Sequence, residues 1–281
     1  MLSRMSKIAC LTLDVEADHH DLGAPRLFAQ VLNDAETWAW LGHVSATRGV
    51  PITAFVVGEL LEAQPGLAAR LAETCAEIGL HSYSHQAATA DSLEEIQRGK
   101  AAFRAVFGQD PVGYRAPLGL ITQAGWERLR AEGFAYDSSI YPSVRPGLFN
   151  GLARPTEPWC LAGEPPLVEL PLATLPRLRL VLSASYVKLL GRGLYRSLLT
   201  VGGLPDVAVI DCHLHDLTFA TEAYPFLPAR WKVVYGCNRN GGRAALTWIL
   251  DMLRARDYTF CTMAQAAAMV RARAVKRGDH A

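Results

Sequence analysis

Short apolar runs alternate with longer segments of helical periodicity along most of this chain. Runs at 8–14 and 207–213 are rich in aliphatic residues, as expected of strands buried on both faces. A helical pattern at 92–107 begins with Ser92, which forms a capping box with Glu95 three residues later. The repeated alternation of strands and helices predicts parallel strands joined by right-handed crossovers, which is an α/β fold.

About seven strands are expected, and this number favours a TIM-type barrel over an open sheet. We expect a single domain over residues 1–276, with an insertion at about 142–205 and a frayed tail at 277–281. Unusual polar residues fall at or just after the carboxyl ends of the predicted strands. In such barrels this is the face that holds the active site, and the residues are Asp14, His81, Arg115, Asp137, His213 and His215.

The composition narrows the class of protein. The chain has 281 residues, of which 50% are hydrophobic and 20% charged, and its net charge of +1 gives no reason to expect a nucleic-acid partner. None of the six cysteines has CxxC spacing, which is typical of a reducing compartment. We recognise no export signal and no apolar stretch of the roughly 18 residues that a spanning helix needs, so we expect a cytoplasmic location.

The first predicted strand ends in Asp14-Val15-Glu16. In an extended chain Asp14 and Glu16 point to the same side and Val15 to the other. Two such carboxylates can bind a cation together, or one can bind it while the other acts as a base. A solvated acidic loop is the alternative interpretation, and Asp18 is a further candidate ligand.

The segment His81-Ser82-Tyr83-Ser84-His85 places two histidines four residues apart. On one face of a helical turn they would lie close enough to share a metal ion. Alone, this spacing could also arise by chance on a surface. Together with an acidic pair at another strand end, it predicts a site of two histidines and one carboxylate with positions left open for water and substrate.

Two later segments carry further candidates. Arg115 at a strand end could orient a carboxylate through a bidentate hydrogen bond, although an ordinary loop arginine is the alternative. The last strong strand ends in His213 and His215, flanked by acids. One of these histidines could be a general acid held by a nearby carboxylate such as Asp137. A buried structural histidine is the alternative, and it describes His213 better than His215.

These four segments, in this order, resemble the polysaccharide deacetylases, a carbohydrate esterase family with a deformed (β/α) barrel of seven to eight strands. The family pattern is a strand ending in an acidic pair, then H-[ST]-x-x-H, then R-x-P-x-G, then a late strand ending in L-x-H. The chain has LDVE at 13–16, HSYSH at 81–85, RAPLG at 115–119 and HLH at 213–215. Two departures are Val15, where the common form has its second aspartate, and His213, where it has leucine.

The resemblance implies a metal-dependent N-deacylase that hydrolyses the amide of an N-acetylated amino sugar. Glu16, His81 and His85 would hold a divalent metal ion. Zn²⁺ is the default for such a ligand set, with Co²⁺, Ni²⁺, Mn²⁺ or iron as alternatives.

The same resemblance implies roles for the remaining polar residues. Asp14 would be the base that takes a proton from water, and Arg115 would hold Asp14 ionised and in place. His215 would donate a proton to the departing amine, with Asp137 supporting it. A backbone N–H near Tyr141 would help to stabilise the oxyanion.

The substrate is less defined. Within 177–200, Lys188, Arg192 and Arg196 fall four residues apart and would form a basic stripe on one helix. A helix packed on the barrel with a solvated basic face is the favoured interpretation. The alternative is peripheral contact with the inner membrane surface, which would fit a lipid-linked or nucleotide-linked amino sugar. A deformylase of a lipid-linked formamido sugar and a non-catalytic glycan-binding barrel also remain open, and the sequence does not indicate an oligomeric state.

Overall fold

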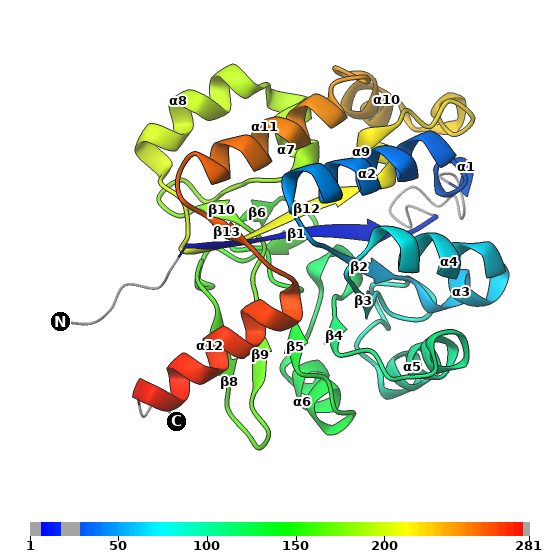
Figure 1. The fold of residues 1–281 in the computed structure, drawn as a ribbon, viewed down its shortest axis with the longest axis vertical. Coiled ribbons are helices and arrows are strands. Elements are labelled where there is room, and N and C mark those ends of the chain that lie inside the picture. The colour runs from blue at the N-terminus through cyan, green and yellow to red at the C-terminus, as the bar shows by residue number, and fades with distance from the viewer. Residues whose placement is uncertain (1–6, 18–28, 278–281) are drawn as a thin grey trace.

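The computed structural model describes residues 7–17 and 29–277. Within this part of the chain, seven parallel strands form a curled sheet in the order β12-β1-β2-β3-β4-β5-β9. β8 adds to β9 in antiparallel direction, and β13 pairs with β1. Beyond β9, Leu172 forms a parallel bridge with Val209 of β12, which brings the two ends of the sheet together. The prediction of a deformed α/β barrel in a single domain is confirmed (Figure 1).

The two longest strands of the main sheet are β1 and β12, and the others are short. Their bounds are β1 (Ile8–Val15), β2 (Ile52–Val56), β3 (Glu77–Leu80), β4 (Gly113–Tyr114), β5 (Tyr136–Asp137), β8 (Trp159–Leu161), β9 (Leu167–Glu169), β12 (Val207–His213) and β13 (Thr259–Phe260). Two small antiparallel hairpins stand outside this sheet, namely β6 (Val144–Arg145) with β7 (Phe149–Asn150) and β10 (Thr174–Leu175) with β11 (Leu180–Val181).

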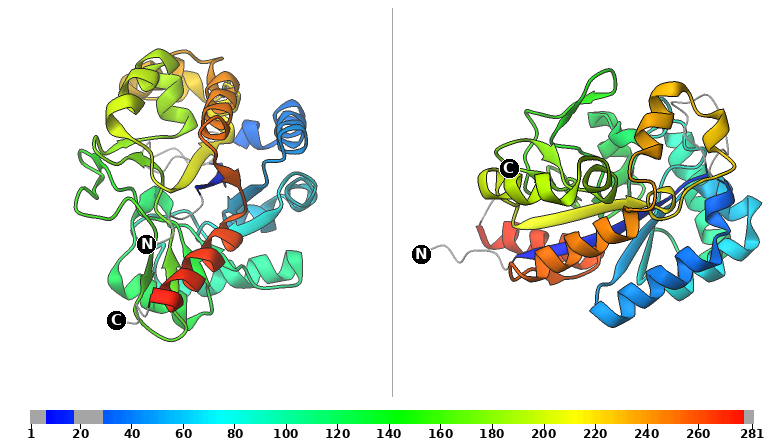
Figure 2. Two further views of the ribbon diagram at one scale, coloured as in Figure 1. Left: turned by 60° about the vertical axis from the view of Figure 1, so that its left-hand side comes forward. Right: turned by 90° about the horizontal axis from the view of Figure 1, so that it is seen from above.

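Helices cover the outside of the curled sheet (Figures 1 and 2). The α-helices are α1 (Ala29–Leu32), α2 (Ala35–Arg48), α3 (Gly58–Ala63), α4 (Pro65–Thr74), α5 (Leu93–Phe107), α6 (Gln123–Ala131), α7 (Ala184–Leu190), α8 (Arg192–Gly202), α9 (Leu214–Leu217), α10 (Ala229–Gly236), α11 (Gly242–Arg254) and α12 (Met263–Arg277). Two 3-10 turns are η2 (Pro117–Gly119) and η3 (Tyr224–Phe226).

The alternation of side chains along β1 divides the core into an outer and an inner part. Leu11, Leu13 and their alternate neighbours pack outward in one large cluster with the surrounding helices. Ile8 and Cys10 point the other way and join a second cluster with Met263 and other residues of α12, which packs against β8 and β9. Apolar side chains therefore fill the inner space near the amino ends of the strands, and the polar inward positions of β1 lie at the opposite, carboxyl end.

The range 142–205, expected to be an insertion, contains the barrel strand β9. The additional structure therefore lies on both sides of this strand. The β6–β7 hairpin precedes it, and the β10–β11 hairpin, α7 and α8 follow it. Both hairpins reach the candidate site described below.

The predicted basic stripe on one helix over 177–200 is wrong. The segment forms two helices, because Gly191 adopts φ +88° and separates α7 from α8. Lys188 lies in α7 and is only 5% exposed, and burial lowers the pKa of its amine. Arg192 and Arg196 remain exposed on α8. No helix in the described ranges is both long and apolar enough to cross a bilayer.

Candidate functional site

The paired strands β1 and β12 bring their polar residues together at the carboxyl end of the barrel. The register pairs Thr12 with Asp211 and Asp14 with His213, so the inward positions of β1 and β12 lie side by side. Glu16 follows β1 on the same inward side. Asp14 and Glu16 are 4% and 7% exposed and both line one pocket, as the strand alternation predicts. Asp18, the alternative ligand, lies outside the described residues.

The HSYSH segment leaves β3 as an irregular turn. The expectation of a helical turn is wrong, because Ser82 and His85 have φ angles of 58° and 61° and interrupt any helix. The turn still brings the rings of His81 and His85 together, with centroids 5.0 Å apart, and both side chains line the same pocket as Glu16.

Glu95 holds this turn in place. Its Oε2 accepts hydrogen bonds from the backbone N–H groups of Tyr83 (3.2 Å) and Ser84 (2.9 Å), and its Oε1 accepts one from the Ser84 hydroxyl (2.8 Å). The capping box expected at the start of α5 is therefore only half formed. Ser92 caps the backbone N–H of Glu95, but the Glu95 carboxylate bonds the histidine turn instead of the Ser92 backbone. The sequence analysis missed this role.

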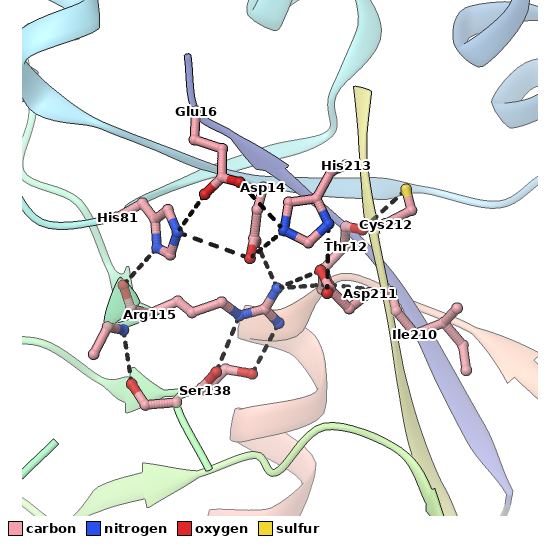
Figure 3. A network of polar contacts seen from close by, with 12 residues as sticks. Thr12, Asp14, Glu16, His81, Arg115, Ser138, Ile210, Asp211, Cys212 and His213 are labelled. Atoms are coloured by element: carbon pink, nitrogen blue, oxygen red, sulfur yellow. Dashed lines mark hydrogen bonds and ion pairs between the residues drawn. The ribbon is translucent and has the colours of Figure 1, made fainter. Parts of the chain in front are cut away.

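Glu16, His81 and His85 offer one ligand atom each within 4.8 Å of one another (Figure 3 shows Glu16 and His81). Glu16 Oε2 lies 2.7 Å from His85 Nε2 and 3.7 Å from His81 Nε2. Two ligands about 2.1 Å from one tetrahedral ion lie roughly 3.4 Å apart, so these separations suit a shared metal ion. His81 Nδ1 lies 2.8 Å from the Arg115 carbonyl oxygen, which can only accept, so Nδ1 carries the proton and Nε2 keeps its lone pair for a ligand role.

The charge on Glu16 also suits a ligand. Burial alone would raise the pKa of its carboxyl, but the charges of His85 and His213 and hydrogen bonds from His81 and His85 outweigh burial. The pKa of Glu16 therefore lies well below its usual range, and the side chain is ionised at neutral pH.

Arg115 connects β1, β5 and β12 from the centre of the barrel (Figure 3) and is 1% exposed. Its Nη1 donates to Asp14 Oδ1 at 2.6 Å, to the Thr12 hydroxyl at 2.9 Å and to Asp211 Oδ1 at 3.2 Å. Its Nε and Nη2 donate to the carbonyl oxygen and the hydroxyl of Ser138, both at 3.0 Å. The guanidinium therefore fixes one oxygen of Asp14 and leaves the other, Oδ2, toward the histidines.

The late histidines do not share a face, because β12 ends at His213 and α9 begins at the next residue. His213 lines the pocket, and its Nε2 lies 3.9 Å from Asp14 Oδ2 and 3.7 Å from Glu16 Oε1. His215, the expected acid, is turned away from the described pocket lining; its ring stacks on His213 at 4.7 Å and contacts Tyr235 edge-on. The geometry thus favours His213 over His215.

Acidic neighbours polarise His213. Its Nδ1 lies 3.3 Å from Asp216 Oδ2 and 3.9 Å from Asp211 Oδ2. Burial alone would lower the pKa of His213, but the charges of Asp211, Glu16 and Asp216 raise it well above its usual value. Asp216 therefore occupies the place beside a late histidine that the sequence analysis gave to Asp137. The pKa of Asp211 rises to about 7, mainly because of burial and the nearby Asp14 charge.

Asp137 lies deeper in the barrel, on β5. Its Oδ1 accepts from the Ser139 hydroxyl at 2.6 Å, and β5 pairs it in register with Glu169 on β9. Burial raises the pKa of Asp137, and burial together with the Asp137 charge raises that of Glu169 well above its usual range. No hydrogen bond within the described ranges joins Asp137 to either late histidine. The Ser139 hydroxyl in turn accepts a hydrogen bond from the Ala116 backbone N–H at 2.8 Å. Asp137 therefore helps, through Ser139, to hold the loop that follows Arg115.

All seven predicted site residues are therefore buried, but they do not all line the pocket. Five of them line it, and His215 and Asp137 do not. Apolar and aromatic side chains also line the pocket, and they include Leu118, Tyr141, Leu148, Phe149, Val181 and Tyr186.

The curled α/β barrel has a buried His-His-carboxylate cluster at the carboxyl ends of its strands, and these features define a class of barrels that could hold a metal ion there. Within that class, a family model described as polysaccharide deacetylase matches residues 32–136. This match includes both the HSYSH and the RAPLG segments, and it confirms the resemblance to the polysaccharide deacetylase family.

Solved structures with similar folds cover almost all of the chain. A Mycobacterium smegmatis protein assigned as a polysaccharide deacetylase has 24% identity and a TM-score of 0.61, over 96% of this chain and 92% of its own. The allantoinase PuuE has 17% identity and a TM-score of 0.58, over 94% and 90%. BA3943 from Bacillus anthracis, a pseudoenzyme of carbohydrate esterase family 4, has 12% identity and a TM-score of 0.54, over 93% and 66%. No curated protein has a significantly similar sequence.

Proposed function

We propose that this protein is a metal-dependent N-deacylase that hydrolyses the amide of an N-acylated amino sugar. The observation that carries the proposal is the arrangement around Asp14. One of its oxygens is fixed by Arg115, and the other lies between the candidate metal ligand His81 and the polarised His213, 3.9 Å from the Nε2 of each. The match of residues 32–136 to the polysaccharide deacetylases supports this class of reaction.

Glu16, His81 and His85 would hold the metal ion. They fit this role because their ligand atoms converge, Glu16 is ionised and the tautomer of His81 directs a lone pair toward Glu16. A divalent ion held there supplies Lewis acidity toward water and the acyl carbonyl. Zn²⁺ is the default for this ligand set, and other divalent ions of the first transition row could replace it.

Asp14 is the general base in this proposal. Its Oδ1 is held at 2.6 Å by Arg115, so Oδ2 is directed into the pocket and can take a proton from water.

His213 is the general acid. Its Nδ1 faces Asp216 while its Nε2 faces the pocket, so a protonated ring can donate from Nε2 to the departing amine. Positioned acids of this kind contribute about 10²–10⁴-fold to a rate. The backbone N–H of Tyr141, a residue that lines the pocket, would assist the oxyanion.

The departure at Val15 does not remove a carboxylate from the site. Val15 is fully buried in the outer cluster, on the face of β1 that packs against helices. Glu16, one position later, is the residue that reaches the pocket. This argues against a non-catalytic barrel that has lost its metal ligand.

The test combines metal content with amine release. We expect the purified protein to bind about one divalent ion and to release amine from N-acetylated or N-formylated amino-sugar glycosides, with the released acid identifying the acyl group. Glu16→Ala should lose the metal, whereas Asp14→Asn should keep it and lose about 10²–10⁴-fold in kcat. A Glu16→Ala protein that kept both metal and activity would refute the proposal, as would full activity after complete chelation.

A further inference from the structure

Residues of η2, the two hairpins and α7 line the pocket between the ends of β4 and β12. This wall begins at η2, where Gly119 adopts φ +69° and packs so closely on Ser139 and Tyr141 that an added Cβ would lie 2.4 Å from the Ser139 carbonyl oxygen. Phe149 of the β6–β7 hairpin stacks on Tyr141, with ring centroids 5.0 Å apart and an angle of 18°. Tyr141 therefore contacts both η2 and the hairpin.

Further contacts join the hairpin to the structure that follows β9. The Ser143 hydroxyl donates to the Arg179 carbonyl oxygen at 2.6 Å, which ties the β6–β7 hairpin to the turn of the β10–β11 hairpin. Beyond this turn, the Ser185 hydroxyl of α7 donates to Asp216 Oδ2 at 2.7 Å, next to His213. These contacts link the segments of the wall from η2 to the end of β12.

The hairpin is a fixed part of this wall. Gly151, directly after β7, lies so close to the Tyr141 carbonyl oxygen that an added Cβ would be 2.0 Å away. Its N–H donates to the Ser143 carbonyl oxygen at 2.7 Å. On the outer side, the Arg145 guanidinium lies over the Trp231 ring of α10, 5.2 Å from its centroid. A wall held at several points is preorganised rather than formed by the substrate.

The space inside the wall is small. The centres of water molecules can reach about 100 Å³ of the pocket. This volume is below the roughly 300–1,000 Å³ of typical ligand sites. It suits one sugar unit with its acyl group and not several consecutive units.

We propose that the substrate is a single N-acylated amino-sugar unit at the end of its carrier, and that internal units of a polymer are excluded. This inference rests on the proposed deacylase function and specifies its substrate class. An internal unit continues into a neighbour at two positions of its ring, so it needs a groove that is open at both ends. The wall from η2 to β12 blocks one of these directions, whereas a terminal unit has only one neighbour and can enter end-on.

Positional analysis of the products tests this inference. The metal-loaded protein is given octyl glycosides of N-acetylated and N-formylated amino sugars and a tetramer of β-1,4-linked N-acetylglucosamine, and mass spectrometry locates each free amine. We expect amine at terminal units, internal units at least tenfold slower, and kcat/KM for the best octyl glycoside equal to or above that for the tetramer. Internal amine at a rate equal to that of the ends would overturn the inference and leave the deacylase function intact. No amine from any glycoside would refute the deacylase function itself.

Variants of the wall provide a second measurement. Leu148→Ala combined with Phe149→Ala removes the apolar top of the hairpin and should raise the share of internal deacylation at least tenfold. Leu152→Ala is the matched control, because Leu152 is 43% exposed in the same segment and does not line the pocket. The control should keep the wild-type pattern. An unchanged pattern in a folded double variant would show that this wall does not select the terminal unit.

Substrate binding can also be measured in the absence of turnover. In saturation-transfer NMR with metal-loaded Asp14→Asn protein, the N-acetyl methyl group of one terminal unit of the tetramer should receive most of the saturation. Equal saturation of internal methyl groups would contradict end-on entry even if the variant were completely inactive.

Discussion

Replacing Glu95 by glutamine tests whether the histidine turn depends on a residue that contacts no substrate. The carboxylate accepts two backbone N–H groups and one hydroxyl from the turn, and it is 8% exposed. Glutamine keeps the size and one acceptor oxygen but loses the charge. The hydrogen bonds from the two backbone N–H groups change from charge-assisted to neutral, which weakens each by about 1 kcal/mol. The turn therefore loses about 2 kcal/mol of stabilisation.

This loss should appear mainly in metal affinity, because the turn carries His81 and His85 and has two residues, Ser82 and His85, with positive φ angles that need outside support. If the 2 kcal/mol acts fully on the turn, the metal dissociation constant rises roughly 30-fold. This magnitude agrees with the 10–100-fold known for residues that position metal ligands. Glu95→Ala, which removes all three bonds, should weaken binding by more than 100-fold.

The assay is competition with a chromophoric chelator at fixed pH, together with thermal unfolding of the metal-free protein. Glu94→Gln is the matched control, since its side chain is 80% exposed one position earlier in the same helix turn. We expect the control to bind metal like the wild type. If Glu95→Gln also bound metal with unchanged affinity, the turn would be held by other contacts, and the reasoning from the three hydrogen bonds would be refuted.

Three further outcomes follow from the site. His213→Ala should lower kcat about 10²–10⁴-fold, whereas His215→Ala should stay within tenfold of the wild type, and the reverse order in steady-state kinetics would restore His215 as the acid. Arg115→Met should lower the free energy of unfolding in urea by about 3–5 kcal/mol, because it leaves the buried carboxylates of Asp14 and Asp211 without their cation. A loss below about 1 kcal/mol would contradict this. The pKa of Glu169 is raised in the folded state. The stabilisation from its protonated carboxyl is therefore fully present at pH values below the unfolded-state pKa near 4.3, and it is lost as the pH rises toward the folded-state pKa. Glu169→Gln should therefore raise Tm more at pH 7 than at pH 4, and an equal effect at both pH values would exclude a protonated Glu169.

The parts of the site that could be predicted from sequence depend on local periodicity. The inward positions of β1 follow from a two-residue repeat, which places Asp14 and Glu16 on one face wherever the strand lies in the sheet. The carboxyl ends of parallel strands meet at one face of the barrel, so His81 and Arg115 could be placed near these acids without any contact being known.

The geometry favours His213 over the expected His215 for a local reason. A strand that continued through His215 would place both histidines on one face, but Asp216 ends the strand early. Its Oδ2 accepts from the His213 backbone N–H at 3.0 Å and so closes the first turn of α9. An acidic residue three positions after a strand end is a helix-start signal, and it was present in the sequence.

Other features could not be predicted, because they depend on the pairing of distant segments. Glu169 meets Asp137 only through the register of β5 and β9. Glu95 reaches the histidine turn only because α5 packs beside it, and its sequence context equally predicts a capping box. The pocket wall needs two hairpins whose strands are two residues long, and such strands leave almost no periodic signal.

The charges at the mouth of the barrel give a physical reason why a dication suits this fold. Buried ionised groups are stable only when opposite charges or metal ions compensate them. Arg115 forms ion pairs with Asp14 and Asp211, and Asp216 lies beside the Nδ1 of His213. Glu16 is ionised, and the charged partners of its carboxylate among the described residues are imidazoles, which as metal ligands are neutral. A divalent ion between Glu16, His81 and His85 would therefore balance the charge of Glu16, which Arg115 does not contact.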